Sequence, residues 1–65
     1  MNYYLWSQEY LNDAEKLNKL IDSLKDKRQN SPPWECKEID DRIIYYRQIR
    51  YDFIRIANKL MQRAT

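Results

Sequence analysis

The sequence predicts an all-α fold: a two-helix antiparallel hairpin with one turn near its middle. Apolar residues recur at steps of three and four in both halves of the chain, which puts each set on one side of a helix. Ser31-Pro32-Pro33 separates the halves, and the 65 residues include no glycine that would interrupt either helix. The first apolar set is Tyr3, Tyr10, Ala14, Leu17, Ile21 and Leu24, and the second is Ile39, Ile43, Tyr46, Phe53, Ala57, Leu60 and Ala64.

The first helix is expected over residues 3–29. Asn2 is a favourable N-cap, because its side-chain oxygen can accept a hydrogen bond from a free backbone N–H of the first turn. Lys25, Lys27 and Arg28 fall in the last turns, where cations interact favourably with the negative end of the helix dipole. These residues mark the two ends of the helix.

The turn is expected at residues 30–32 and the second helix at residues 33–62. Pro32 disfavours helical geometry at Ser31, and both prolines are tolerated only near a helix start. Acidic residues follow in the first turns of this helix, where they favour the positive end of its dipole. They are Glu35, Glu38, Asp40 and Asp41.

A hairpin of this size has little apolar surface to bury when it stands alone, and domains of about 60 residues are marginally stable. With one cysteine and no histidine, the chain has neither an internal disulfide nor a common structural zinc site. The apolar arc of the second helix is also wider than one partner helix can cover. We therefore expect an antiparallel homodimer, a four-helix bundle with residues 33–62 at its centre.

The excess apolar residues of the second helix define the expected dimer interface. Ile49 and Ile56 flank the intrachain set on one side. The residues that extend the other side are assigned to the interface: Ile44, Arg47, Tyr51, Ile54 and Met61. Trp34 is expected to cover the turn end of the hairpin, and Trp6 the open end.

Two charged residues interrupt the apolar arcs. Arg50 occupies a position of the second arc that should be apolar, and Asp13 falls inside the first. If the turn centres near residue 31, the antiparallel register puts these two residues at the same level, as it does Tyr10 and Phe53. Since an unpaired buried charge is costly, we expect a buried Asp13–Arg50 ion pair that fixes the register of the helices.

The sequence gives little support for catalysis. It has no histidine, the commonest general base, and no glycine-rich loop that could bind phosphate. Adjacent acidic residues at the start of the second helix diverge by about 100°, so they do not converge on a metal. Cys36 has acidic neighbours and is interpreted as structural. We expect a protein that is not an enzyme and that binds no metal and no cofactor.

The main alternative is a nucleic-acid-binding dimer of the same architecture. Residues 42–55 mix arginine with aromatic side chains, which can contact phosphates and stack on bases but are also enriched in protein interfaces. The net charge of only +2 and the scattered basic residues favour a protein interface. In the alternative, the phosphate contacts come from Arg47, Arg55, Lys59 and Arg63.

The chain is expected to be cytoplasmic, with no membrane contact. Residues 1–10 lack the basic start and apolar core of a signal peptide, and no apolar run approaches the roughly 18 residues of a membrane span. A lone cysteine is typical of a reducing compartment. Lys, Asn, Ile and Tyr have AT-rich codons and are abundant, which favours a low-GC bacterial or phage genome. The expected function is regulation by contact with a protein partner.

Overall fold

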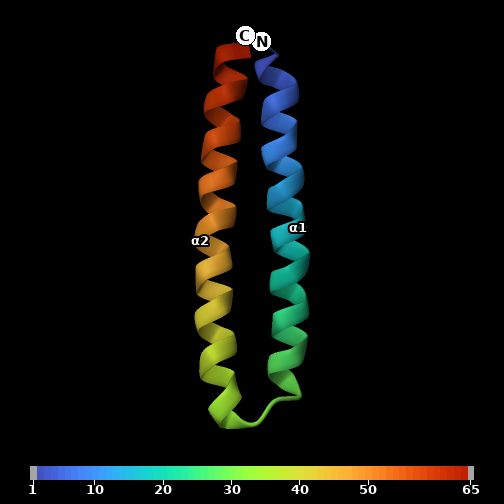
Figure 1. The fold of residues 1–65 in the computed structure, drawn as a ribbon, viewed down its shortest axis with the longest axis vertical. Helices are drawn as coiled ribbons and strands as arrows, with labels where there is room; N and C mark the ends of the chain where they lie inside the picture. The colour runs from blue at the N-terminus through green and yellow to red at the C-terminus, as the bar shows by residue number, and fades with distance from the viewer. Residues whose placement is uncertain (1, 65) are drawn as a thin grey trace.

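The computed structural model describes residues 2–64 and consists of two helices joined by a short turn. Helix α1 is Tyr3–Gln29 and helix α2 is Pro33–Ala64. The two ends of the described chain lie together at one end of the molecule, and the turn lies at the other (Figure 1). The predicted all-α hairpin and the bounds of α1 are confirmed, whereas α2 continues to Ala64 instead of ending near residue 62.

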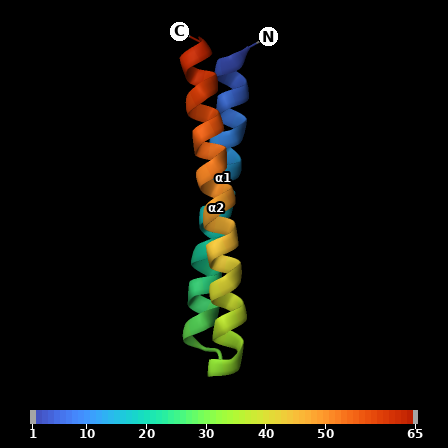
Figure 2. The ribbon, with the colours of Figure 1, turned by 90° about the vertical axis from the view of Figure 1, so that its left-hand side faces the viewer.

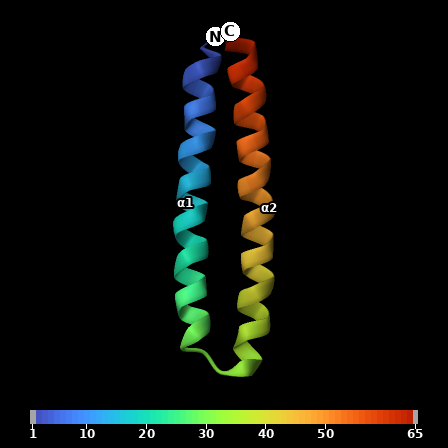
Figure 3. The ribbon, with the colours of Figure 1, turned by 180° about the vertical axis from the view of Figure 1, so that it is seen from behind.

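The hairpin is long and thin, with Cα extents of 49 × 14 × 13 Å. In the side view α1 and α2 cross each other (Figure 2), and the view from behind shows the same two rods next to one another (Figure 3). Within the described residues, the seam between the two helices is the one place where a core can form. A binding site on such a molecule must therefore lie on an outer face of the helices.

The first turn of α1 and the connection to α2 are held by short local hydrogen bonds. The Oδ1 atom of Asn2 accepts from the backbone N–H of Leu5 at 3.1 Å, which confirms the predicted N-cap. After the last turn, the Ser31 hydroxyl donates to the backbone carbonyl of Lys27 at 2.6 Å. The same carbonyl accepts from the backbone N–H of Asn30 at 3.1 Å, so the end of α1 is closed before Pro33 begins α2.

The seam repeats every seven residues, as in an antiparallel coiled coil. The buried residues of α1 are Ser7, Ala14 and Ile21, and those of α2 are Ile39, Ile43, Ala57 and Leu60. Near the turn, Ile21 packs with Ile39 and Ile43, and two half-buried side chains, Leu24 and Tyr46, pack against this cluster.

Aromatic side chains fill the open half of the seam. The rings of Tyr10 and Phe53 meet edge to face with centroids 5.6 Å apart, which confirms the register predicted for this pair. Trp6 packs between Tyr3 and Tyr10, with ring centroids 6.5 Å and 6.4 Å away. Trp6 therefore belongs to an aromatic group near the open end of the hairpin, although its side chain is on a lateral face and is still 39% exposed.

The predicted position of Trp34 is wrong. Its side chain is 77% exposed and does not cover the turn. The first buried residue of α2 is Ile39, and a residue five positions earlier lies about 140° away around the helix. Trp34 therefore falls on the outer side of α2.

A layer of small side chains lies near the open end. Ser7 and Ala57 are both 0% exposed, and the seven-residue register places them opposite each other. The Ser7 hydroxyl donates to the carbonyl of Tyr4 in its own helix at 2.6 Å, so its polar group is satisfied inside the seam. Ala64, which the sequence places in the seam, is exposed because the register carries it past the start of α1.

Candidate protein-interaction face

Two lateral faces flank the seam, and a hollow on each shows which residues share it. One hollow is lined by Lys25, Arg28, Asp40, Ile43, Ile44 and Arg47. The other is lined by Lys27, Glu35, Glu38, Ile39 and Arg42. Because steps of seven residues stay on one face of paired helices, each set can be extended along the hairpin. We call the two sides the Ile44 face and the Trp6 face.

The Ile44 face holds all the residues predicted to form the dimer interface. On α2 it comprises Ile44, Arg47, Tyr51, Ile54 and Met61, and on α1 it comprises Tyr4, Leu11, Glu15, Asn18 and Lys25. Ile44 is 54% exposed and Tyr51 is 63% exposed, and both border a shallow hollow that Arg47 also lines. This face therefore presents apolar side chains from both helices to solvent.

The contribution of α1 to this face was not predicted. Leu11 is half-buried and Tyr4 is exposed, and they lie seven residues apart on the Ile44 face. Both fall outside the apolar stripe of α1, which follows the seam. The seven-residue step from Tyr4 to Leu11 is the signal in the sequence that could have identified them.

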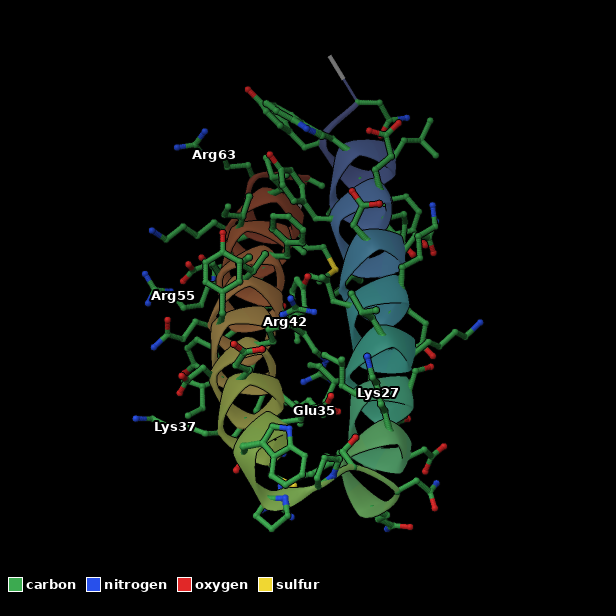
Figure 4. The ribbon with its side chains drawn as sticks, turned by 60° about the horizontal axis from the view of Figure 1, so that its bottom comes forward. Lys27, Glu35, Lys37, Arg42, Arg55 and Arg63 are labelled. Carbon is green, nitrogen blue, oxygen red and sulfur yellow. The ribbon has the colours of Figure 1, made fainter. Side chains whose placement is uncertain are left out.

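The Trp6 face carries apolar residues that are separated by charges. It comprises Trp6, Asp13 and Leu20 on α1, and Arg42, Ile49 and Ile56 on α2. At its turn end, Lys27, Glu35 and Arg42 lie near one another between the two helices (Figure 4). The Ile44 face also carries charges at its turn end, but its apolar side chains are more exposed: Ile44 is 54% and Tyr51 is 63% exposed, against 39% for Trp6.

Asp13 and Arg50 do not form the predicted buried ion pair. Asp13 is exposed, and the ion pair found among residues 2–64 is instead between Arg28 and Asp40. The register places Ala14 opposite Arg50, and Asp13 lies about 100° away from Ala14 around α1. Asp13 is therefore on the Trp6 face, whereas Arg50 borders the Ile44 face.

Arg50 is half-buried in the seam and lacks an acceptor. Its Nε atom is buried and has no hydrogen-bond partner among the described residues. The small side chain of Ala14 leaves room for the aliphatic stem of Arg50 on the opposite helix. Leaving a buried N–H of a charged group without an acceptor is unfavourable by more than about 1 kcal/mol. Within the described residues, the hairpin therefore supplies no hydrogen-bond acceptor for the Nε–H of Arg50.

The observed ion pair joins the two helices at the turn end of the Ile44 face. Arg28 Nε donates to Asp40 Oδ1 at 2.7 Å. The hydrogen bond to Asp40 and the negative charge of that residue raise the pKa of Arg28 above its usual value. Both side chains are close to half exposed, so solvent screens the pair and its contribution to stability is small.

Cys36 lies at the turn, close to two backbone carbonyls. The Cys36 thiol lies 3.6 Å from the carbonyl of Arg28 and 3.7 Å from that of Ser31, close enough to donate to either. Among residues 2–64, no group of three or more cysteine and carboxylate side chains could hold a metal ion. The thiol therefore serves the turn, where it joins the start of α2 to the end of α1.

The residues proposed to contact phosphates fall into two groups. Arg55, Lys59 and Arg63 follow one another at steps of four along the outer side of α2. Arg55 and Arg63 project from α2 on the side away from α1 (Figure 4), and the Arg55 guanidinium lies 6.0 Å from the centre of the Tyr51 ring. Arg47 instead belongs to the Ile44 face. The four residues therefore do not form a single basic line.

Comparison with protein-family models, curated proteins and solved structures finds no match to this chain. In the part of the chain that the structure describes, neither helix is both long enough and apolar enough to cross a membrane. The two lateral faces and the outer side of α2 are therefore the features from which a function can be argued.

Proposed function

We propose that this hairpin is a small non-enzymatic protein–protein interaction module that acts as a homodimer, a four-helix bundle formed through the Ile44 face. The observation that carries the proposal is the stripe of exposed Ile44 and Tyr51, continued by half-buried Ile54 and Met61. An exposed apolar patch on a small polar protein usually marks an interface. A second copy of the chain offers a matching patch.

The accessible surface area supports the same proposal. The hairpin exposes 5235 Å² for a mass of 8.1 kDa. A compact monomer of this mass would expose about 4,500 Å². The difference of about 700 Å² is close to the roughly 800 Å² that each partner contributes to a standard interface. One isologous contact would therefore bring the exposed area of the chain to the level typical of a compact protein.

The dimer leaves other surfaces free for a target. With the Ile44 face covered, the Trp6 face and the exposed Trp34 side chain stay accessible, and tryptophan is among the residues that dominate binding energy in interfaces. We propose that the module regulates a protein target by presenting or blocking such a surface. The single cysteine, Cys36, fits an action in the cytoplasm.

Sedimentation equilibrium at micromolar concentration tests the dimer. The wild-type chain should give about twice its mass of 8.1 kDa, and Ile44→Glu should give the monomer because it buries a charge in the interface. Tyr45→Glu is the matched control, since Tyr45 is 59% exposed on the same helix but lies outside the Ile44 face. A wild-type chain that stays monomeric and fully helical over this range contradicts the proposal.

Nucleic-acid binding by the dimer is the second candidate. The observation that favours it is the basic ridge of α2: Arg55 and Arg63 project away from α1 (Figure 4), and Lys59 lies midway between them in the sequence. A ridge of cations can follow a phosphate backbone without reading its sequence. It ranks second because three exposed cations give only weak binding.

A further inference from the structure

The buried Nε atom of Arg50 indicates where the hairpin is incomplete. It has no acceptor among residues 2–64, and the side chain borders the Ile44 face. A guanidinium in a partly buried site is best satisfied by a carboxylate, which accepts two parallel N–H bonds. The missing acceptor should therefore be an acidic side chain that reaches the Ile44 face.

Glu15 is the carboxylate at the right level. It follows Ala14, the residue that faces Arg50 across the seam, and it is exposed. Its heptad position is on the outer edge of α1, away from α2 of the same chain. Glu15 is therefore available to a second copy rather than to its own Arg50.

Two hairpins can pack through their Ile44 faces in two symmetric ways. If the two-fold axis runs along the hairpin, the turns lie at the same end and each α1 packs on the partner's α2. If the axis runs across the hairpin, the turns lie at opposite ends, α1 packs on α1, and α2 packs on α2. The charges on the face distinguish the two arrangements.

The same-end arrangement places opposite charges together. It brings Arg50 to the level of Glu15 of the partner subunit, and Lys25 to the level of Asp40 of the partner subunit, while Leu11 faces Ile54 of the partner subunit. The opposite-end arrangement instead packs α1 against α1, and because the exposed Glu15 is near the middle of Tyr3–Gln29, it brings Glu15 close to the level of Glu15 of the partner subunit. Like charges across an interface are unfavourable.

We propose that the dimer packs with both turns at the same end and that Arg50 of each copy binds the carboxylate of Glu15 of the partner subunit. This inference rests on the proposed dimer and defines its geometry. It replaces the arrangement with α2 at the centre that the sequence predicts. It also gives Arg50 a role as the residue that selects the arrangement of the bundle.

Charge exchange between two chains tests the inference. Glu15→Lys and Arg50→Glu each place like charges at both symmetric contacts, so each variant alone should dimerise at least about tenfold more weakly than the wild type. An equimolar mixture restores both contacts, because the new lysine of one chain meets the new glutamate of the other. Analytical ultracentrifugation of the mixture should recover a dimer within a few-fold of the wild-type affinity.

The controls separate the possible outcomes. Glu9→Lys makes the same charge change on an exposed position of α1 outside the Ile44 face, and it should leave dimerisation unchanged. If the mixture of the two single variants does not recover dimerisation, the inference is overturned. This holds even if a chain that carries both substitutions does dimerise, because that result also fits a pair within one hairpin. If the wild-type chain does not dimerise at all, the proposed function itself is contradicted, and the inference about the dimer geometry falls with it.

A distance measurement covers the case in which Arg50→Glu does not fold. A spin label is placed beside the turn through Glu35→Cys in a Cys36→Ser background. Because Glu35 is on the Trp6 face, the two labels lie on opposite outer sides of the same-end dimer, and their separation should be about twice the 14 Å width of one hairpin, extended by the linkers. A label separation that approaches the 49 Å length of the hairpin would show opposite ends and overturn the inference.

Discussion

Ser7 and Ala57 set how closely the two helices approach at the open end of the hairpin. Both are fully buried and small, so the backbones can come together without a void. The Ser7 hydroxyl bonds to a carbonyl of its own helix at 2.6 Å, which removes most of the cost of burying it. The packing at this layer therefore depends on side-chain volume and not on polarity.

This layer makes a specific prediction for Ser7. Ser7→Leu should lower the free energy of unfolding by about 1–3 kcal/mol, because the added atoms overpack the layer and push Ala57 away. Ser7→Ala keeps the volume small and should change the free energy by less than about 1 kcal/mol. Urea denaturation followed by circular dichroism, at one fixed protein concentration, measures both. Equal losses for the two variants would mean that the hydroxyl, not the volume, decides this layer.

Asp13 and Arg50 should act independently in stability, because Asp13 lies on the Trp6 face and Arg50 lies in the seam on the side of the Ile44 face. Asp13→Asn, Arg50→Met and the double variant form a double-mutant cycle, and we expect a coupling energy below about 0.5 kcal/mol. The exposed Asp13 should contribute little on its own. Urea denaturation of the four proteins measures the cycle. A coupling above about 1 kcal/mol would restore the ion pair that the sequence predicts.

The error at Asp13 and the omission of Ser7 have physical causes. The antiparallel register gave the level of Arg50 correctly, but a straight-helix wheel drifts by about 20° per heptad relative to a true seven-residue seam. The wheel therefore places Asp13 inside the apolar arc, whereas in the structure Asp13 lies beside it. The predicted apolar stripe lacks Ser7 because hydropathy treats serine as polar, even where its hydroxyl bonds to a carbonyl of its own helix.

At the scale of the elements, the bounds of both helices follow from local chemistry. The N-cap Asn2, the proline pair and the absence of glycine each act within a few residues, which is why α1 was predicted at Tyr3–Gln29 as it is observed. The side of α2 taken by Trp34 and the α1 part of the Ile44 face depend on contacts between helices. Those contacts are not encoded in any one segment.

The cap of α1 supplies a prediction at this scale. Asn2→Ala should lower the free energy of unfolding by about 1 kcal/mol, because the N–H of Leu5 loses its acceptor. Asn2→Asp is the control and should retain stability, since aspartate caps equally well. Hydrogen exchange of the first-turn amides, together with urea denaturation, measures the effect. If Asn2→Ala and Asn2→Asp behave alike, the side-chain cap is not what holds the start of α1.

For the whole molecule, the two candidate functions use different surfaces. Self-association uses the Ile44 face, and binding to a polyanion would use the outer side of α2 with Arg55, Lys59 and Arg63. Because the two surfaces differ, a dimer could carry both activities. Arg55 lies 6.0 Å from the Tyr51 ring of the Ile44 face, so dimerisation of Arg55→Glu is measured alongside its binding to a polyanion.

The basic ridge predicts weak, salt-dependent binding to duplex DNA or RNA and nothing tighter. If its three cations contact phosphates, the logarithm of the binding constant should fall with the logarithm of salt concentration with a slope of about −3. At physiological salt, the dissociation constant should lie in the range of about 10⁻⁴ to 10⁻⁶ M that is typical of non-specific binding.

Arg55→Glu should weaken this binding, and Lys19→Glu, the same charge change on exposed α1, should do so less. Fluorescence anisotropy with a labelled duplex over a salt series measures all of these quantities. Submicromolar affinity at physiological salt, lost in Arg55→Glu but kept in Lys19→Glu, would make nucleic acid the primary ligand of this hairpin.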